Sequence, residues 1–447
     1  MPIVSTMANI AIRPLGFGSL SSSYWHIDVV DSNLNSQAGN NIIQLANGNI
    51  AYTLSDAAYD PITTYDAGII VVVNKSGELQ WSRSIYHTGS VNTLSLSIAS
   101  DSSSNIYAHV YDQQTDDVDL VKFDSSGTYQ WARRISFSDT LQSNGIACNS
   151  DGSYVYLNVG INATSTDIGV VKFNTGTLAI AWDERASTAN NYQTAYGYIA
   201  LDSSENVYQL MVDLSEDNAC VTKWNSSGTF QWGKAYVTNT ASLGAVIYGI
   251  DTDSSGNVYF GFGDTTYDTI HVVKVNSSNV VQWSRSLTKS GIGISSSGSF
   301  VVDSNNNVYL LMGYGDAAGK SFSLIAKYDS SGVLQFQRKL SADLGGVDSL
   351  PSFDGLNVTS DGMYISGANA LYHNLIFLPS DGSGTGTWSQ PSDGSLIYTY
   401  ENDSMTDSSF TLTTGTNPAG TTWAPTLNAT GLPSTATVTP TINKAGL

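Results

Sequence analysis

Short hydrophobic runs alternate with polar turn residues along most of this 447-residue chain. Residues 203–212 (SSENVYQLMV) and 254–263 (SSGNVYFGFG) are typical, because a cluster of Ser, Asn or Gly precedes a run rich in Val, Tyr and Phe. Runs of about four to eight such residues between turn residues predict β-strands. Only 13 % of the residues are charged, which is too few for long exposed helices. The pattern predicts an all-β protein.

One aromatic position recurs at a nearly constant interval. The series is Trp81, Trp131, Trp182, Trp232, Trp283, Phe336 and Trp388, with gaps of 50, 51, 50, 51, 53 and 52 residues. The flanking sequence repeats as well, as SGTYQWARRI (126–135) and SGTFQWGKAY (227–236) show. A fixed period of this length indicates an array of equivalent supersecondary units.

Each unit contains four strand-like runs. In the fifth unit these runs lie within 248–253, 254–263, 272–276 and 282–287. The DSSG and NSSG segments between them suit tight hairpins, because Asp or Asn caps the turn and Gly accepts a positive φ. Four antiparallel strands repeated seven times predict a seven-bladed β-propeller of four-stranded antiparallel blades.

The repeat resembles a known family. The unit D-S-S-G-N-V-Y … V-V-K-V-N … Q-W-S-R-S-L (253–287) resembles the seven-bladed β-propeller repeats of bacterial and phage proteins and, more loosely, quinoprotein-like propeller repeats. The resemblance covers roughly residues 40–390. The shared residues are turn, core and blade-packing residues, so the resemblance implies the fold and implies neither a catalytic motif nor a quinone site.

An eighth copy of the outer strand stands near the N-terminus, where Trp25 lies in YWHIDVV (24–30). We expect this strand to complete the last blade and close the ring; the alternative is that the strand containing Trp388 does so. The expected organisation is an N-terminal arm at 1–22, the propeller at 23–395 and a β-rich C-terminal extension at 396–447. Strands are expected at 396–403 and 408–414. Because residues 434–447 include alternating Thr and Val, we expect them to add as a strand to a neighbouring subunit.

The net charge is −20, and most of the 18 Lys and Arg residues fall in repeated positions. These are Lys122, Lys172, Lys223, Lys274 and Lys327 in the third strands, and Arg83, Arg133, Arg134, Arg185, Lys234, Arg285, Arg338 and Lys339 in or near the fourth. A cation that recurs in unit after unit is expected to pack between blades, on an aromatic ring or against a turn Asp. The remaining basic residues are too few and scattered for a nucleic-acid interface.

No segment predicts membrane insertion or export. The longest apolar run, at 68–73, is much shorter than the ~20 residues of a membrane helix. Residues 1–18 lack the basic and then apolar regions of a signal peptide. We therefore expect synthesis in a host cytoplasm without a signal peptide.

No catalytic, cofactor-binding or metal-ligating residue is predicted. The five histidines, which lack metal-ligand spacing and are expected to be ordinary strand or surface residues, are His26, His87, His109, His271 and His373. The segment DTDSSGN (251–257) is similar to a calcium loop but lacks the twelfth-position Glu, so a hairpin turn is expected and a structural cation is the alternative. Cys148 and Cys220 are expected to be free thiols, with a single bridge as the alternative.

The connections fall into two classes. The first–second and third–fourth connections are short, whereas the second–third connections (such as 112–119) and the blade-to-blade links (such as 341–352) are longer and variable. Antiparallel connectivity places both variable classes on one face, and variable loops on a rigid scaffold usually carry binding. No individual binding residue is predicted.

Three functions of different classes fit these observations. The preferred hypothesis is a non-enzymatic structural protein of a bacteriophage particle, tail-associated as a nozzle, hub, spike or fibre. Its expected partners are other tail proteins, copies of itself and host surface glycan, its location is the virion, and no cofactor is implied. The alternatives are a lectin-like propeller at a bacterial surface and a propeller enzyme, such as a lyase, a glycosidase or a quinoprotein relative.

Overall fold

A computed structural model describes residues 25–29, 36–37, 41–56, 67–86, 94–112, 117–136, 141–161, 167–187, 192–213, 218–237, 246–263, 268–316, 320–343, 352–368, 373–389, 397–409, 413–414, 419–422, 426–428 and 434–437. Every regular element in these ranges is a β-strand. No helix among the described residues has the length and apolar character needed to span a bilayer.

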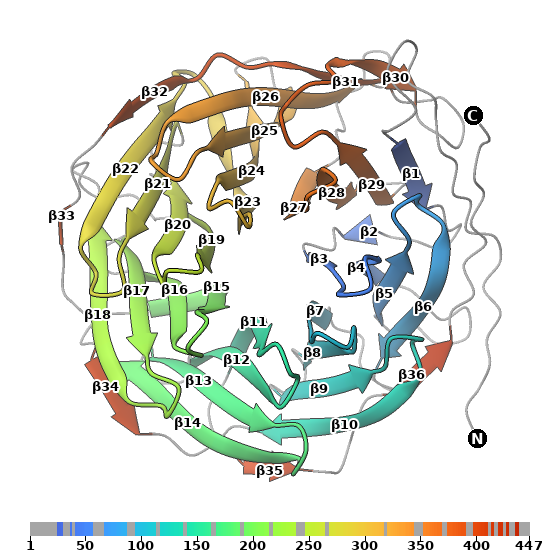
Figure 1. Ribbon diagram of the computed structural model, residues 1–447, viewed down its shortest axis with the longest axis vertical. Coiled ribbons are helices and arrows are strands. Elements are labelled where there is room, and N and C mark those ends of the chain that lie inside the picture. The colour runs from blue at the N-terminus through green and yellow to red at the C-terminus, as the bar shows by residue number, and fades with distance from the viewer. Residues whose placement is uncertain are drawn as a thin grey trace.

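Five consecutive repeat units each form a sheet whose four antiparallel strands follow one another from the axis outward (Figure 1). Their strands are β7 (Leu94–Ser100), β8 (Ile106–Asp112), β9 (Asp117–Phe123) and β10 (Tyr129–Ser136); β11 (Leu141–Cys148), β12 (Tyr154–Ile161), β13 (Asp167–Asn174) and β14 (Ala179–Ser187); β15 (Tyr192–Leu201), β16 (Val207–Asp213), β17 (Asn218–Trp224) and β18 (Phe230–Val237); β19 (Val246–Thr252), β20 (Val258–Gly263), β21 (Thr269–Val275) and β22 (Val281–Thr288); and β23 (Gly293–Val302), β24 (Val308–Gly315), β25 (Ser321–Tyr328) and β26 (Leu334–Asp343). The repeated Trp or Phe lies on the fourth, outer strand of each sheet.

The first and last units meet where the ring closes. The first contains β2 (Ser36–Gln37) and β3 (Ile42–Gln44), both paired with β4 (Ile50–Asp56), and then β5 (Ala67–Val73) and β6 (Leu79–Tyr86). The last contains β27 (Ser352–Val358), β28 (Met363–Ala368), β29 (His373–Leu378) and β1 (Trp25–Val29). Because β1 pairs with β29, with Trp25 opposite Phe377, the N-terminal strand supplies the fourth strand here. The alternative strand with Trp388, β30 (Gly386–Ser389), instead lies at the edge of the preceding sheet.

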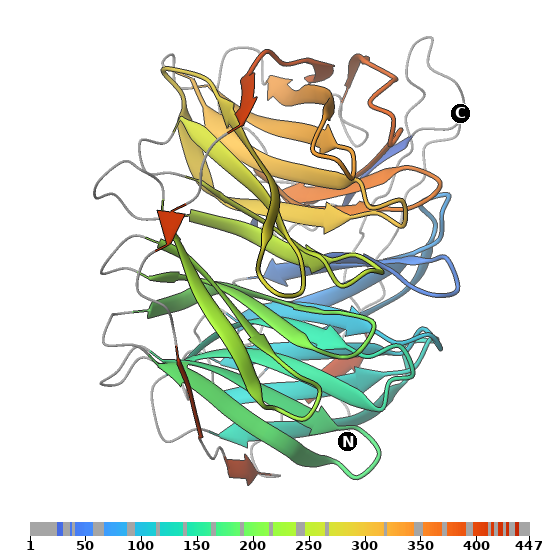
Figure 2. The same ribbon diagram turned by 60° about the vertical axis from the view of Figure 1, so that its left-hand side comes forward.

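In the ranges that the structure describes, the C-terminal extension adds one strand to the outer edge of six sheets. Its strands are β31 (Ile397–Asn402), β32 (Thr406–Ser409), β33 (Thr413–Thr414), β34 (Ala419–Thr422), β35 (Thr426–Asn428) and β36 (Ser434–Thr437). They pair, in that order, with β26, β22, β18, β14, β10 and β6. The extension therefore runs backward around the outside of the ring, where its strands are drawn in red (Figures 1 and 2). We call residues 397–437 the C-terminal belt.

The belt changes two expectations about the chain's end. Strand addition occurs, but within the described residues it joins the belt to the chain's own outer strands, where we expected a neighbouring subunit. The outer strand of a blade presents an edge of free backbone N–H and C=O groups, and any extended segment that reaches this edge can pair with it. The expected strand at 408–414 is divided, because its two ends belong to different sheets, as β32 and β33.

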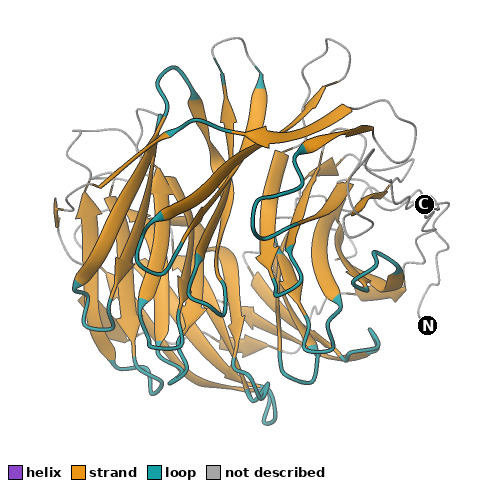
Figure 3. Cartoon of the chain, turned by 45° about the horizontal axis from the view of Figure 1, so that its top comes forward, coloured by secondary structure: helices purple, strands orange, loops and turns teal. Residues whose placement is uncertain are grey.

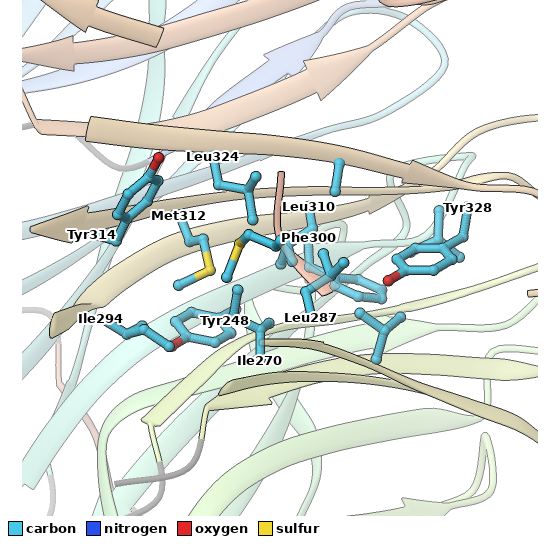
Figure 4. Close-up of a cluster of buried hydrophobic side chains, with 14 of the residues drawn as sticks. Tyr248, Ile270, Leu287, Ile294, Phe300, Leu310, Met312, Tyr314, Leu324 and Tyr328 are labelled. Atoms are coloured by element: carbon cyan, nitrogen blue, oxygen red, sulfur yellow. The ribbon is translucent and has the colours of Figure 1, made fainter. Parts of the chain in front are cut away.

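Among the described residues, the hydrophobic core forms seven clusters, each lying between two neighbouring sheets. The cluster between β19–β22 and β23–β26 contains Tyr248 from the first of these sheets and Phe300, Leu310 and Tyr328 from the second (Figure 4). Another cluster joins the last sheet to the first and includes Trp25, Tyr52 and Tyr364. Because both faces of each sheet are buried, the strands are apolar on both sides. The expected all-β propeller with four-stranded antiparallel blades is confirmed.

Candidate functional site

The recurring tryptophan joins its sheet to the next one. Its indole nitrogen donates a hydrogen bond to a backbone carbonyl in the neighbouring third–fourth hairpin, at 2.9–3.2 Å. The pairs are Trp25–Lys75, Trp81–Ser125, Trp182–Ser226, Trp232–Ser277 and Trp283–Ser330. The glycine of the same hairpin has a positive φ and lies against the ring: a Cβ on Gly127 would stand 2.5 Å from Cδ2 of Trp81. The motif SGTYQW therefore serves inter-sheet packing.

The repeated lysines complete the same contact. Lys172, Lys223, Lys274 and Lys327 donate to a carbonyl in the next sheet's hairpin, at 3.1–3.3 Å. Each also lies over a tyrosine ring of the second strand in its own sheet, as Lys274 lies 4.7 Å from the Tyr259 ring centroid. The hydroxyl of Tyr259 in turn donates to Asp253 at 2.9 Å. Aromatic rings attract cations through their quadrupole, so the repeated cations act as packing groups, as the sequence predicts.

The arginines in the outer strands follow the same rule in part. Arg83 lies 5.8 Å from the Trp81 ring centroid and Arg338 lies 5.3 Å from that of Phe336. Arg134 is different, because it is buried and forms a bidentate ion pair with Asp119 at 2.8 and 2.9 Å within one sheet.

Polar groups join three chain segments where the ring closes. Asn374 Oδ1 on β29 is 2.9 Å from His26 Nε2 on β1 and accepts a hydrogen bond from the Tyr398 hydroxyl on β31, also at 2.9 Å. His26 is fully buried, and this burial lowers its pKa to about 3, so the imidazole is neutral. On the other side of the last sheet, Asp361 between β27 and β28 forms an ion pair with Lys75, which lies between β5 and β6 of the first sheet. The N-terminal strand, the last repeat and the belt are thus connected.

The first part of the belt is held by buried and half-buried charges. Asp403 accepts hydrogen bonds from Lys289 at 2.6 Å and from the Tyr314 hydroxyl at 2.7 Å. Asp407 pairs with Arg285 and accepts a bond from the Tyr328 hydroxyl at 3.1 Å. Tyr398, Tyr400 and Met405 are buried in the same region, in the two clusters on either side of β23–β26. The belt is therefore an integral part of these sheets.

The segment similar to a calcium loop is a hairpin turn, as predicted. Asp253 accepts hydrogen bonds from the Ser255 and Asn257 amides, both at 2.9 Å, and from the Asn257 side chain at 2.8 Å. Asp251 accepts a bond from the Val302 amide of the next sheet at 2.8 Å, and burial raises its pKa to about 6. Both carboxylates are engaged by protein donors, and the described residues contain no group of three His, Cys, Asp or Glu side chains suited to a metal ion.

Four of the histidines lie in strands and are buried, which is more than the sequence indicated. They are His26, His109, His271 and His373; His87 lies outside the described residues. Burial lowers the pKa of His109 and of His373 to about 4. Cys220 is buried, Cys148 is half-buried, and both are free thiols, as expected.

The innermost strands contain a feature that our sequence reasoning missed. Four residues before the turn of each first hairpin stand small residues in most sheets, namely Asn41, Ser97, Gly145, Gly249, Ser299 and Gly355, whereas β15 has Tyr198. The hydroxyl of Tyr198 reaches the Gly298 carbonyl on β23, beyond the intervening β19, at 3.5 Å. Gly249, at the equivalent position of β19, lies close to β23: a Cβ on Gly249 would stand 2.7 Å from Cβ of Phe300. Aligning the repeats by their turns would have revealed this position.

The variable loops expected to carry binding lie mostly outside the described residues. Most of the described loops are short hairpins that gather at one end of the strands (Figure 3). Part of one blade-to-blade link, 288–292, is described, and it contains the Lys289 that holds the belt. The prediction that the variable face binds a partner therefore stays a prediction.

Comparisons with known proteins show little beyond this geometry. No protein-family model and no curated protein matches the sequence. Among solved structures, a Bacteroides caccae protein of unknown function is 13 % identical with a TM-score of 0.40, over 64 % of this chain and 93 % of that one. The quinohemoprotein alcohol dehydrogenase of Comamonas testosteroni is 10 % identical with a TM-score of 0.42, over 86 % of this chain and 76 % of that one. A subtype N11 neuraminidase-like protein of a flat-faced bat virus from Peru is 10 % identical with a TM-score of 0.42, over 74 % and 98 %. These similarities are too weak to carry an inference about function.

Proposed function

We propose that this protein is a non-enzymatic structural component of a bacteriophage particle, associated with the tail, in which each of the seven sheets is one blade of a seven-bladed propeller. The observation that carries the proposal is the C-terminal belt, which covers the outer edge of six sheets. Uncovered blade edges are sites of uncontrolled strand pairing between copies. A ring with covered edges suits a particle in which many copies stand close together at fixed positions.

The repeated polar residues support a scaffold role. The Trp, Lys, Tyr and Asp side chains that recur between 101 and 330 bond to neighbouring sheets or to their own turns. Residues that stabilise the scaffold in every unit are poor candidates for a unique active site. Recognition then falls to the variable loops of one face, where the composition in Tyr and Asn suits stacking and hydrogen bonding to host surface glycan. Other tail proteins and further copies of this chain are the proposed structural partners.

Mass spectrometry of purified particles tests the proposal. The protein should be present in stoichiometric amount in density-purified phage particles and should remain after washing in high salt. Its absence from particles, together with recovery from the bacterial surface fraction, would favour the lectin-like alternative and refute ours. Turnover of a glycan by the purified protein, with release of product, would refute the non-enzymatic part.

The location of recognition is tested separately by replacing loops. Replacement of 112–117 and of 264–267 by short Asn-Gly hairpins should weaken binding to host cells while leaving the melting temperature nearly unchanged. A matched change in the opposite face, Ser278→Gly in the hairpin after β21, should not alter binding. Full binding by both loop variants would contradict the assignment of the variable face.

A further inference from the structure

All six strands of the C-terminal belt pair with their sheets at the same register. In each sheet the residue five positions after the repeated Trp or Phe stands opposite the corresponding belt residue. The pairs are Ser341–Thr399, Thr288–Thr406, Val237–Thr413, Ser187–Ala419, Ser136–Thr426 and Tyr86–Ser434. The belt is therefore a set of equivalent additions rather than a tail with accidental contacts.

This register reveals a second repeat in the sequence. The belt residues that hold the equivalent position are Thr399, Thr406, Thr413, Ala419, Thr426 and Ser434, with spacings of 7, 7, 6, 7 and 8 residues. Seven residues beyond Ser434 stands Thr441, which begins the segment T-I-N. The belt strand β35 has the similar sequence T-L-N at 426–428. Thr441 thus begins a seventh unit of the same repeat.

One sheet has no belt strand in the part of the chain that the structure describes. This is the sheet β1–β29–β28–β27, in which β1 pairs on one side only. Trp25 occupies the repeated aromatic position of β1, because it stands opposite Phe377 as Trp283 stands opposite Lys274. The outer edge of β1 is therefore equivalent to the edges that the six described belt strands cover.

We propose that the outer edge of β1 is the docking site of residues 441–444 of the same chain, so that the belt passes around the whole ring. In this arrangement the common register pairs Ile442 with Val29 and Asn443 with Asp28. Backbone N–H and C=O groups supply the bonds, which explains why the side chains of the belt units vary while their register is constant.

The length of the chain favours an occupant from the same molecule. The last described belt strand, β36, lies on the sheet of β3–β6, which shares a core cluster with the sheet of β1. Three residues, 438–440, separate Thr437 from Thr441, and three residues also separate β31 from β32, β32 from β33 and β34 from β35. A link of the length found in three of the five steps between belt strands therefore reaches β1 from β36.

A complete belt has a consequence for assembly. With the edge of β1 covered, the outermost strand of every sheet comes from the C-terminal part of the chain and, in five of the six sheets with a described belt strand, from a short belt strand of two to four residues. Very short edge strands offer few backbone groups for strand addition by a second copy, so we expect copies to associate through the faces of the disk. If the edge instead received residues 441–444 of a second copy, the copies would be linked edge to edge. The identity of the occupant thus decides how copies associate.

Disulfide trapping in the full chain tests the proposal. The test variant is Asp28→Cys with Asn443→Cys, and the matched control is Ser286→Cys with Ser408→Cys, an observed pair at the equivalent register. The expected result is a link within one chain in similar yield in both variants, identified by peptide mass spectrometry. Asp28→Cys with Ala445→Cys, which is two residues out of register, should link much less.

Two results would overturn the proposal: no link in the test variant when the control links, or a link found only between chains in a covalent dimer.

Hydrogen exchange provides a second measurement that needs no substitution in β1. Removal of 441–447 should speed exchange of the outward amides of β1 by at least tenfold and leave those of β10 unchanged. Equal exchange at β1 with and without these residues would contradict the docking.

Discussion

Asp403 is the best position at which to test how the belt is held. Its side chain is 2 % exposed, and it accepts hydrogen bonds from Lys289 at 2.6 Å, from Tyr314 at 2.7 Å and from the Ser404 amide at 2.7 Å. Burial alone would raise the pKa of Asp403, but the hydrogen bonds from Lys289 and Tyr314 outweigh it and hold the pKa below its usual value. Asp403→Ala removes one acceptor from three donors at once.

The expected loss of stability follows from the environment of those donors. Breaking a buried ion pair by removing one partner costs about 3–5 kcal/mol. The Lys289 side chain is 31 % exposed and regains water, so its share is smaller, whereas the buried Tyr314 hydroxyl loses an acceptor at about 1–3 kcal/mol. We therefore expect Asp403→Ala to lower the free energy of unfolding by about 2–4 kcal/mol.

Glu401, on β31 two residues before Asp403, provides the control. It pairs with Lys339 at 2.8 Å, but its side chain is 49 % exposed, and exposed ion pairs contribute about 0–1 kcal/mol. Urea unfolding followed by tryptophan fluorescence measures both variants, and hydrogen exchange at 397–402 detects local release of the belt. Equal effects of Asp403→Ala and Glu401→Ala in both measurements would refute the argument that burial decides the contribution.

Three further predictions follow from the inter-sheet contacts and the buried histidines. Gly127 has φ +76, and a Cβ on it would stand 2.5 Å from the rigid Trp81 ring, so Gly127→Ala should lower the free energy of unfolding by about 2–4 kcal/mol. Gly291→Ala, at φ +79 with nothing within 4 Å of the added Cβ, should lower it by only about 1–2 kcal/mol. Equal losses in thermal unfolding would argue against the clash. Trp283→Phe should lower the free energy of unfolding in urea by about 1 kcal/mol more than Trp131→Phe does. The reason is that the Trp283 indole donates a hydrogen bond to the Ser330 carbonyl at 3.1 Å, whereas the described residues give the Trp131 indole no such acceptor. A larger loss for Trp131→Phe would contradict this account. Burial lowers the pKa of His373 from 6.5 to about 4, so the unfolded chain takes up a proton more readily, and the stability that this residue contributes is complete above pH 6.5 and is lost as the pH falls toward 4. The free energy of unfolding of His373→Leu should therefore change by about 3 kcal/mol less between pH 7 and pH 4 than that of the wild-type chain. Asp251, whose pKa burial raises to about 6, has the opposite pH dependence, but it is present in both proteins and cancels in their difference. The same pH profile in both proteins would be the contrary result.

The local repeats were predictable because their chemistry is contained in short segments. The turn Asp or Asn bonds amides two and four residues ahead, as Asp124 does with Ser126 and Thr128, and the glycine of each hairpin needs no distant partner to adopt its φ. The period of the aromatic series then specified the length of the repeated unit, although its last member, Trp388, lies on β30 at the edge of the preceding sheet and not on the fourth strand of its own unit. The packing role of the lysines also followed from recurrence, since a group that recurs in five units at one position serves what those units share.

Strands in the C-terminal extension were predicted, but the path of the belt along the chain's own outer strands was not, although its repeat is visible in the printed sequence once the register is known. Its units are short, and apart from the Thr, Ser or Ala at one position they have little in common. Backbone pairing requires an extended conformation and almost nothing of the side chains. The four buried histidines were missed for a related reason. A histidine in a strand has the same local sequence whether it faces solvent or a neighbouring sheet, and only the packing of distant strands buries it.

The sequence by itself thus determined the strands, the hairpins, the four-stranded unit and the residues that bond one unit to the next, because all of these depend on neighbours within about 50 residues of the chain. The tertiary structure decided which strand closes the ring, where the C-terminal segment lies and which polar groups are buried. These features depend on contacts between residues far apart in the chain, such as His26 with Asn374. Many strand-like segments of this sequence have a similar composition, so the local sequence does not show which two of them pair, and only the closed ring does.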